Sequence, residues 1–173
     1  MTKLKNGLII LMSLTAIVFS YAQETTKISA KDFKVLIGSW QGSLTYLDYS
    51  SGKPYTMPAD AEIKRIGTTN KFIFSNIYPN ETSANSFDTL TISVDGKFIG
   101  TERVKSKKKL ENGTIEIITE ELGNDGNDSK PAIFRQTYTI SRGIFKKRKD
   151  VQFQGATSWI NRHEYLYKIR NRK

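Results

Sequence analysis

The fold is decided by the stretch "LIGSWQGSLTYLDYSSGKP", residues 36–54. From Trp40 onward, apolar and polar residues alternate, which places Trp40, Leu44 and Tyr46 on one face of a β-strand. Gly38 and Gly42 lie on either side of the tryptophan, where they leave room for the indole and for a sharp entry into the strand. The Ser-Gly-Lys-Pro sequence at residues 51–54 predicts a turn. The stretch therefore predicts a strand that begins with a large ring.

The rest of the chain repeats this pattern of short alternating segments separated by turn residues. Asp95-Gly96 is the strongest tight-hairpin signal. Only Ser29–Ile37 has helical spacing, with Ser29 as the expected cap. About 8–10 short strands with brief links are typical of an all-β sandwich or barrel in a single domain. The expected strands are residues 40–48, 61–66, 71–78, 87–94, 97–104, 114–122, 133–141, 151–154 and 164–169.

Closure of the sheet explains the position of the tryptophan. An open sheet exposes unpaired backbone groups at its edges, and a closed barrel removes these edges. In an up-and-down antiparallel barrel, the first and last strands pair, so Trp40 is expected beside Ile169 and Arg170. We expect Trp40 to plug one end, Arg170 to stack on the indole through a cation–π contact, and the turn at 29–37 to cap the same end.

The Gly38-Ser39-Trp40 step after a short helical turn, combined with Arg170 near the end of the last strand, resembles the calycin superfamily. That group contains the lipocalins, the fatty-acid-binding proteins and related bacterial barrels. The continuation to residue 54 is similar to small secreted lipocalin-like domains of Bacteroidetes-type bacteria. The chain differs from typical lipocalins because it has no cysteine and has shorter links. The resemblance implies a closed antiparallel up-and-down β-barrel, lipocalin-like, with an internal ligand cavity.

Aromatic residues on the inward faces of the expected strands are the candidates for binding a ligand. Tyrosines among aliphatic residues suit a small hydrophobic or amphipathic guest, because their hydroxyls can meet its polar group. The alternative is that these side chains fill the interior and leave no space. Gly38, Trp40 and Arg170 are expected to be structural. The candidate cavity residues are Tyr46, Phe74, Phe134, Tyr138, Tyr165 and Tyr167.

The first 22 residues predict a secretory signal peptide. Lys3 and Lys5 precede 13 mostly apolar residues, and Ser20-Tyr21-Ala22 offers small residues for cleavage near Ala22. The apolar run is shorter than the roughly 20 residues of a membrane-spanning helix. The expected mature chain, 23–173, contains no transmembrane segment and no cysteine for lipid attachment. These features predict a periplasmic or secreted protein.

The chain is basic, with a net charge of +10 that falls to +8 without Lys3 and Lys5. Two runs, "RVKSKKKLENG" at 103–113 and "FKKRKD" at 145–150, carry much of this charge. They are interpreted as solvated hairpins. The alternative function is an envelope interaction module, a filled barrel that contacts an anionic surface or a protein partner. Nucleic acid is not an expected partner, because the basic runs lack interleaved aromatic residues.

No catalytic, metal-binding or cofactor-binding set is predicted, so enzyme activity stays uncertain. His163 is the only histidine, and its place at a strand start suggests exposure; a haem-binding barrel with His163 as ligand is a less favoured alternative. The segment "GNDGNDS" offers oxygen donors for calcium but lacks the closing glutamate, which favours a turn. Glu102 with Arg135 could hold a polar headgroup if both point inward; the alternative is a surface pair. An enzyme using the barrel pocket ranks last.

Overall fold

The computed structural model describes residues 27–48 and 50–170. The predicted signal segment and its cleavage site lie outside these residues. The chain first forms a short helix, α1 (Ala30–Phe33), continued by a 3₁₀ turn, η1 (Lys34–Leu36). The Asp32 carboxylate accepts a hydrogen bond from the Ser29 backbone N–H at 2.7 Å and pairs with Lys107 Nζ at 2.7 Å. No helix in the described part of the chain is long and apolar enough to cross a membrane.

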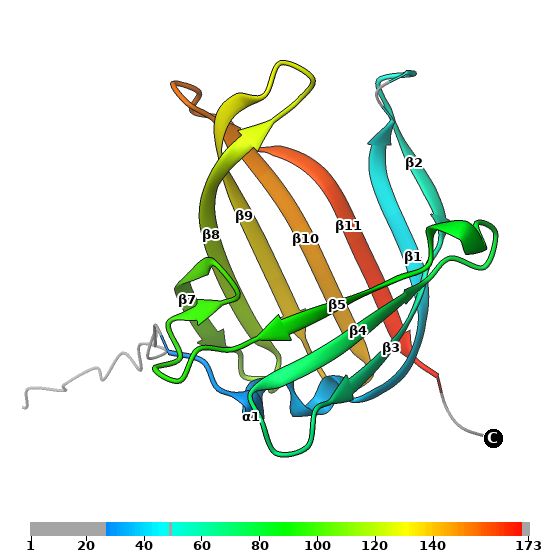
Figure 1. The fold of residues 1–173 in the computed structure, drawn as a ribbon, viewed down its shortest axis with the longest axis vertical. Helices are drawn as coiled ribbons and strands as arrows, with labels where there is room; N and C mark the ends of the chain where they lie inside the picture. Colours follow the sequence, from blue (N-terminus) through cyan, green and yellow to red (C-terminus); the bar gives the residue numbers. More distant parts are fainter. Residues whose placement is uncertain (1–26, 49, 171–173) are drawn as a thin grey trace, which may run out of the picture.

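Antiparallel β-strands make up most of the remaining structure (Figure 1). A second 3₁₀ turn, η2 (Thr82–Ala84), separates β4 from β5. The strands are β1 (Gly38–Asp48), β2 (Lys53–Pro58), β3 (Asp60–Arg65), β4 (Lys71–Ile77), β5 (Ser86–Thr91), β6 (Phe98–Ile99), β7 (Glu102–Lys109), β8 (Ile115–Asp125), β9 (Lys130–Ile140), β10 (Ile144–Phe153) and β11 (Ile160–Ile169).

The strands follow one another around a nearly closed barrel, in the order β5-β4-β3-β1-β11-β10-β9-β8-β7-β6. The first and last strands pair as expected, with Trp40 opposite Ile169. On its other edge β1 pairs with β3 through its first residues and with β2 further along. A bridge between Ile92 and Ile99 joins the β5 end of this order to β6. The prediction of an all-β, antiparallel barrel is confirmed, and the barrel is nearly closed.

The sheet has eleven strands rather than the expected 8–10. The segment 53–58 forms β2, because the turn after β1 is followed directly by residues that pair back onto it. The expected strand 97–104 is divided into β6 and β7 at Gly100, whose φ of 58° lies in the left-handed region that favours glycine. The polar loop expected at 123–131 is shorter than predicted, since β8 extends to Asp125 and β9 begins at Lys130.

The largest difference from the sequence interpretation concerns residues 144–153. Only 151–154 were expected to be a strand, and the lysine-rich run before them was interpreted as a hairpin. The whole segment is β10, paired with β9 on one side and β11 on the other. Both neighbouring strands form backbone hydrogen bonds with β10, so this lysine-rich segment is a central strand of the sheet and not a hairpin.

One end of the barrel is filled. Phe33 and Leu36 from the N-terminal turn are fully buried there, and Figure 1 shows α1 beneath the barrel at the lower end of the view. The Trp40 indole is 1% exposed, donates its Nε1–H to the Leu36 carbonyl at 2.7 Å and packs edge-on against Phe145. The turn therefore caps the barrel at the tryptophan end, as the sequence predicts. Arg170, however, pairs with Asp60 Oδ2 at 2.7 Å, so an ion pair takes the place of the expected cation–π contact.

Candidate functional site: a polar cavity above the core

A cavity of about 390 Å³ lies inside the barrel, above the filled end. Its walls come from β4, β5, β6, β7, β9, β10 and β11 and from the segment between β6 and β7. Figure 1 shows β3, β4 and β5 crossing in front of the wall formed by β8 to β11 in the lower half of the view. The lining residues are Phe74, Asn76, Asp88, Thr89, Leu90, Ile99, Gly100, Thr101, Glu102, Gln136, Tyr138, Phe145, Lys147, Lys149, His163, Tyr165 and Tyr167.

The strand register explains why the interior changes from filled to hollow. Alternate residues of each strand face the inside, and their cross-strand partners form rows across the sheet. The first row, next to the core, is apolar apart from one tyrosine hydroxyl: Ile115, Ile140, Phe145, Tyr167 and Gly42. The second row mixes Ile117, Tyr138, Lys147, Tyr165 and Leu44. The third row is largely polar: Thr119, Gln136, Lys149, His163 and Tyr46.

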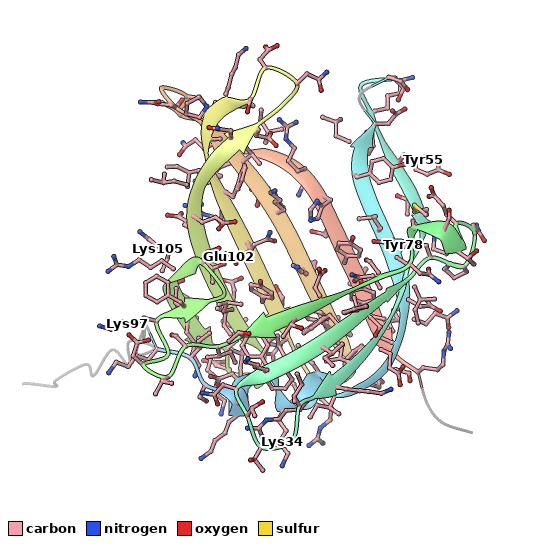
Figure 2. All side chains as sticks on the ribbon, viewed as in Figure 1. Lys34, Tyr55, Tyr78, Lys97, Glu102 and Lys105 are labelled. Atoms are coloured by element: carbon pink, nitrogen blue, oxygen red, sulfur yellow. The ribbon has the colours of Figure 1, made fainter. Side chains whose placement is uncertain are left out.

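Stacked aromatic rings form the floor of the cavity. Tyr167 stacks on Phe145 and on Tyr165, each with ring centroids 5.7 Å apart. The Tyr165 hydroxyl lies 2.9 Å from the hydroxyl of Tyr78, which follows β4 and is labelled in Figure 2. Burial raises the pKa of both Tyr165 and Tyr167, so these phenols stay neutral. The floor is therefore an uncharged aromatic surface with hydroxyl groups at its edge.

Two lysines and a histidine on neighbouring strands line the wall above this floor. Lys147 and Lys149 are two residues apart on β10, so both side chains face inward, and His163 is the β11 partner of Lys149. Burial lowers the pKa of Lys147, although Glu102 and Asp88 act in the opposite direction. Burial, with the charges of Lys147 and Lys149, lowers the pKa of His163 to about 4. At neutral pH the imidazole is consequently neutral, beside the two lysine side chains.

Glu102 supplies an acidic group on the β7 side of the cavity (Figure 2). Its carboxylate accepts hydrogen bonds from the Thr119 hydroxyl and, at 3.4 Å, from the Tyr138 hydroxyl. Burial raises the pKa of Glu102, and burial together with the Glu102 charge raises that of Tyr138. The carboxylate is thus held by neutral donors on β8 and β9 rather than by a cation.

Gln136 contributes an unused acceptor to the same wall. Its Oε1 atom is buried and has no hydrogen-bond partner among the described residues. Gln136 pairs with Lys149 on β10 and with Thr119 on β8, which places it at the centre of the third row. A buried acceptor without a donor costs free energy, about 1–3 kcal/mol. This atom is therefore a natural contact for a guest that carries an N–H or O–H group.

A second hollow, of about 620 Å³, adjoins the cavity at the barrel rim and shares Lys149 and His163 with it. Tyr46 contributes to its lining, as do residues of the turn after β1. Across this rim, Arg162 donates from Nε to Asp125 Oδ2 at 2.7 Å, which ties β11 to the β8–β9 hairpin. The two hollows together extend from the aromatic floor to the surface.

The predicted cavity residues have different positions in the structure. Phe74, Tyr138, Tyr165 and Tyr167 line the main cavity, and Tyr46 lines the rim hollow. Phe134 lines neither; it lies in the row beyond the third, where the Lys149 ammonium is 4.0 Å from its ring centroid. Whether any of these residues contacts a ligand stays a prediction.

The predicted cavity residues do not include Lys147, Lys149, His163 or Glu102, all of which line the cavity. The run "FKKRKD" was interpreted as a solvated hairpin, and this was wrong, because alternation along β10 turns Lys147 and Lys149 inward. The exposure suggested for His163 was also wrong, since the residue lines the cavity. A period-two reading of the run as a strand would have found the two lysines.

Two further alternatives from the sequence are settled by ion pairs. Glu102 points inward, but Arg135 binds Glu120, with 2.6 Å between Nη2 and Oε1, and stacks on Trp159, so the proposed Glu102–Arg135 anchor does not form. The "GNDGNDS" segment is the β8–β9 hairpin, and its two carboxylates pair with Arg162 and Lys130. Within the described residues, no group of three or more His, Asp or Glu side chains is arranged to hold a metal ion.

Comparison with known proteins finds distant structural similarities. No family model matches the chain, and no curated protein matches its sequence. Among solved structures, Rv2717c from M. tuberculosis is 12% identical, with a TM-score of 0.48 over 84% of this chain and 99% of that chain.

Two other solved structures show similar values. A DUF3598-family protein of unknown function from Nostoc punctiforme is 11% identical, with a TM-score of 0.44 over 85% of this chain and 51% of that chain. The S-type phycobiliprotein lyase CPES from Guillardia theta is 8% identical, with a TM-score of 0.46 over 86% and 96%. Because all three TM-scores lie below 0.5, the barrel assignment rests on the strand pairing of this chain.

Proposed function

We propose that this protein binds a small amphipathic molecule in the cavity above its core. The change along the inner face, from a filled apolar row to a hollow lined by polar side chains, carries the proposal. A barrel that served only as a solid scaffold would continue its apolar packing through the second and third rows. Lysine side chains facing a cavity cost solvation free energy, and a bound guest could offset that cost.

The size and lining of the cavity suit this role. Ligand sites in proteins are typically clefts of about 300–1,000 Å³ with an apolar surface and a few polar groups. The aromatic floor formed by Phe145, Tyr165 and Tyr167 offers the apolar contact, and the third row offers hydrogen-bonding groups. The guest is expected to lie with its apolar part on the floor and its polar part toward the rim.

The alternative of a filled barrel acting through a basic surface loses the part of its support that came from the run at 145–150. Of the basic run in β10, Lys147 and Lys149 face the cavity, while Lys146 and Arg148 pair with Glu164 and Asp150. The barrel is also not filled throughout. Ligand binding is therefore the function that the described residues support best.

A fluorescence titration with N-phenyl-1-naphthylamine, an uncharged apolar probe, tests the proposal. Asn76 lines the cavity from β4, and a tryptophan there would occupy the space. The next residue, Ile77, points outward and is 37% exposed, so Ile77→Trp is the matched control. We expect saturable binding to the unmodified protein and to Ile77→Trp, and at least tenfold weaker binding to Asn76→Trp.

Equal binding to all three proteins would contradict the cavity as the site, and so would the absence of saturable binding. Native mass spectrometry of protein isolated from its own host offers an independent test. A retained small molecule that is absent from the Asn76→Trp variant would support the proposal and give the mass of the guest.

We also propose that the protein acts outside the cytoplasm, as a member of the lipocalin-like barrels of the calycin type. The proposal is supported by the charged start, apolar run and small residues of the first 22 positions. Cell fractionation with N-terminal sequencing tests it. A mature chain beginning at Gln23 in the periplasmic or extracellular fraction is expected, and an intact chain confined to the cytoplasm would refute it.

A further inference from the structure

We propose that the guest is an anion, and that its carboxylate, sulfonate or phosphate group is bound by Lys147 and Lys149. This inference rests on the proposed function and names the chemistry of the ligand's polar end. It also assigns the two lysines of β10, which the sequence interpretation placed on the surface, to the binding site.

The two lysine side chains face the same cavity. Residues two apart on a strand point to the same side, and both lysines line the cavity. The strand is central in the sheet, so β9 and β11 prevent either side chain from turning to the outer surface. Their nitrogen atoms lie near aromatic rings of β9: Lys149 Nζ is 4.0 Å from the ring centroid of Phe134, beyond the third row, and Lys147 Nζ is 6.0 Å from that of Tyr138, in the second row.

Neither lysine has an acidic partner at ion-pair distance. Among residues 27–48 and 50–170, every ion pair within 4.0 Å involves other cations. The outward lysine next to them, Lys146, does have such a partner, Glu164, at 3.5 Å. The contrast between neighbouring lysines of one strand indicates that the inward pair is left available for an anion from outside the chain.

The carboxylates that face the cavity are already engaged by neutral donors. Glu102 accepts from Thr119 and Tyr138, and Asp88 on β5 accepts from Asn76 Nδ2 at 3.2 Å. Glu121, on the inner face of β8, accepts from Thr101 Oγ1 at 2.7 Å. These acids lie on β7, β5 and β8, none of which neighbours β10 in the sheet. None of the three carboxylates forms an ion pair with Lys147 or Lys149.

Neutral groups next to Lys149 favour an anion that also carries a hydrogen-bond donor. Gln136 Oε1 is buried without a partner, and Gln136 is the β9 neighbour of Lys149. On the other side, the neutral His163 imidazole can donate one hydrogen bond and accept another. An acid with an adjacent N–H or O–H group, attached to an apolar body that covers the aromatic floor, satisfies all of these groups together.

A matched pair of probes separates this inference from the proposed function. 1-Anilinonaphthalene-8-sulfonate has the rings and N–H of N-phenyl-1-naphthylamine and adds one sulfonate. We expect the sulfonate to bind the unmodified protein at least tenfold more tightly at low ionic strength. The advantage should shrink in 1 M NaCl, because salt screens charge attraction.

Substitution of the lysines locates the effect. Lys147→Gln and Lys149→Gln should each weaken binding of the sulfonate about fivefold to tenfold and leave binding of the uncharged probe within twofold. The control is Lys146→Gln on the outer face of the same strand, which should leave both probes within twofold. Circular dichroism shows whether each variant is folded. If a lysine variant does not fold, displacement of the uncharged probe from the unmodified protein by decanoate and by decanol replaces it, and decanoate should compete at least tenfold better.

The outcomes are distinguishable. If the uncharged probe binds in the cavity but the sulfonate binds no better, with no response to the lysine substitutions, the anion inference is overturned and the proposed function stands. If neither probe responds to Asn76→Trp, the proposed function fails as well. If Lys146→Gln weakens the sulfonate as much as the inward substitutions do, the effect is general surface charge, and the assignment of Lys147 and Lys149 is refuted.

Discussion

The substitution Gly42→Ala tests the closure of the barrel at the strand that opens it. Gly42 lies opposite Tyr167 in the β1–β11 pair. A Cβ atom added at Gly42 would lie 2.7 Å from Tyr167 Cδ1 and closer still to the Leu166 carbonyl oxygen. One of these contacts is with backbone, so it cannot be relieved by a rotamer change. The two strands must separate, or Tyr167 must leave its place on the aromatic floor.

Three contributions determine how far Gly42→Ala lowers the free energy of unfolding. Overpacking a well-packed interior costs about 1–3 kcal/mol. Stretching a neighbouring β1–β11 hydrogen bond adds about 1 kcal/mol. Replacing glycine by alanine lowers the conformational entropy of the unfolded chain, which stabilises the folded protein by about 0.4–1 kcal/mol. We therefore expect the free energy of unfolding to fall by about 2–3 kcal/mol, which corresponds to a decrease in Tm of roughly 5–10 °C for a chain of this size.

Urea denaturation followed by tryptophan fluorescence measures the change. Trp40 is buried two residues from the substitution and reports directly on this seam. Ser43→Ala, in the next position and without a comparable approach, should change the free energy by less than about 0.5 kcal/mol. Gly100→Ala has open space around the added Cβ but a φ of 58°, so it should cost only about 1 kcal/mol of backbone strain. A Gly42→Ala protein as stable as Ser43→Ala would refute the close approach of β1 and β11.

Three further predictions concern the capped end and the cavity. Trp40→Phe removes the hydrogen bond to the Leu36 carbonyl and leaves a space, so urea titration should show a loss of about 2–3 kcal/mol. Asp32→Ala removes the carboxylate that accepts from the Ser29 backbone N–H and pairs with Lys107, so the free energy of unfolding should fall by about 1–2 kcal/mol. The control is Asp128→Ala on the exposed β8–β9 hairpin, which should lower it by less than about 0.5 kcal/mol. His163 has a folded-state pKa of about 4, below its unfolded value, so the unfolded chain binds the proton first and stability is lost as the pH falls from about 6.5 to 4. This pKa difference contributes at most about 3 kcal/mol to the free energy of unfolding, and less where solvent reaches the imidazole ring. The His163→Gln variant should therefore lose less stability than the unmodified protein between pH 6.5 and 4. Parallel curves of unfolding free energy against pH for the two proteins would refute the burial of His163.

Much of the fold was predictable because it depends on local patterns. Period-two alternation identified most strands, and the Asp95-Gly96 turn lies where expected, between β5 and β6. The pairing of Trp40 with Ile169 followed from the rule that closed sheets join their terminal strands. The division of one expected strand at Gly100 was not predicted, because a positive φ is a backbone property that composition only suggests.

The candidate site was predicted only in its aromatic part. Tyr138, Tyr165 and Tyr167 line the cavity, and their apolar bodies made them recognisable as inward residues. Lys147 and Lys149 were assigned to the surface, because a charged run usually faces water. Burying them required a central strand with partners on both sides, which is a property of the assembled sheet.

Local patterns were enough to predict the antiparallel strands, their turns and the tryptophan at the start of the first strand, because alternation, turn residues and glycine spacing act over a few residues. Where the interior is full and where it is hollow follows only from the assembled sheet. That outcome depends on which side chains from five or six strands meet in the same row, and the rows are set by the register between strands. Register joins residues that lie far apart in the chain, such as Lys149 and His163 or Thr119 and Gln136, so no local pattern contains it.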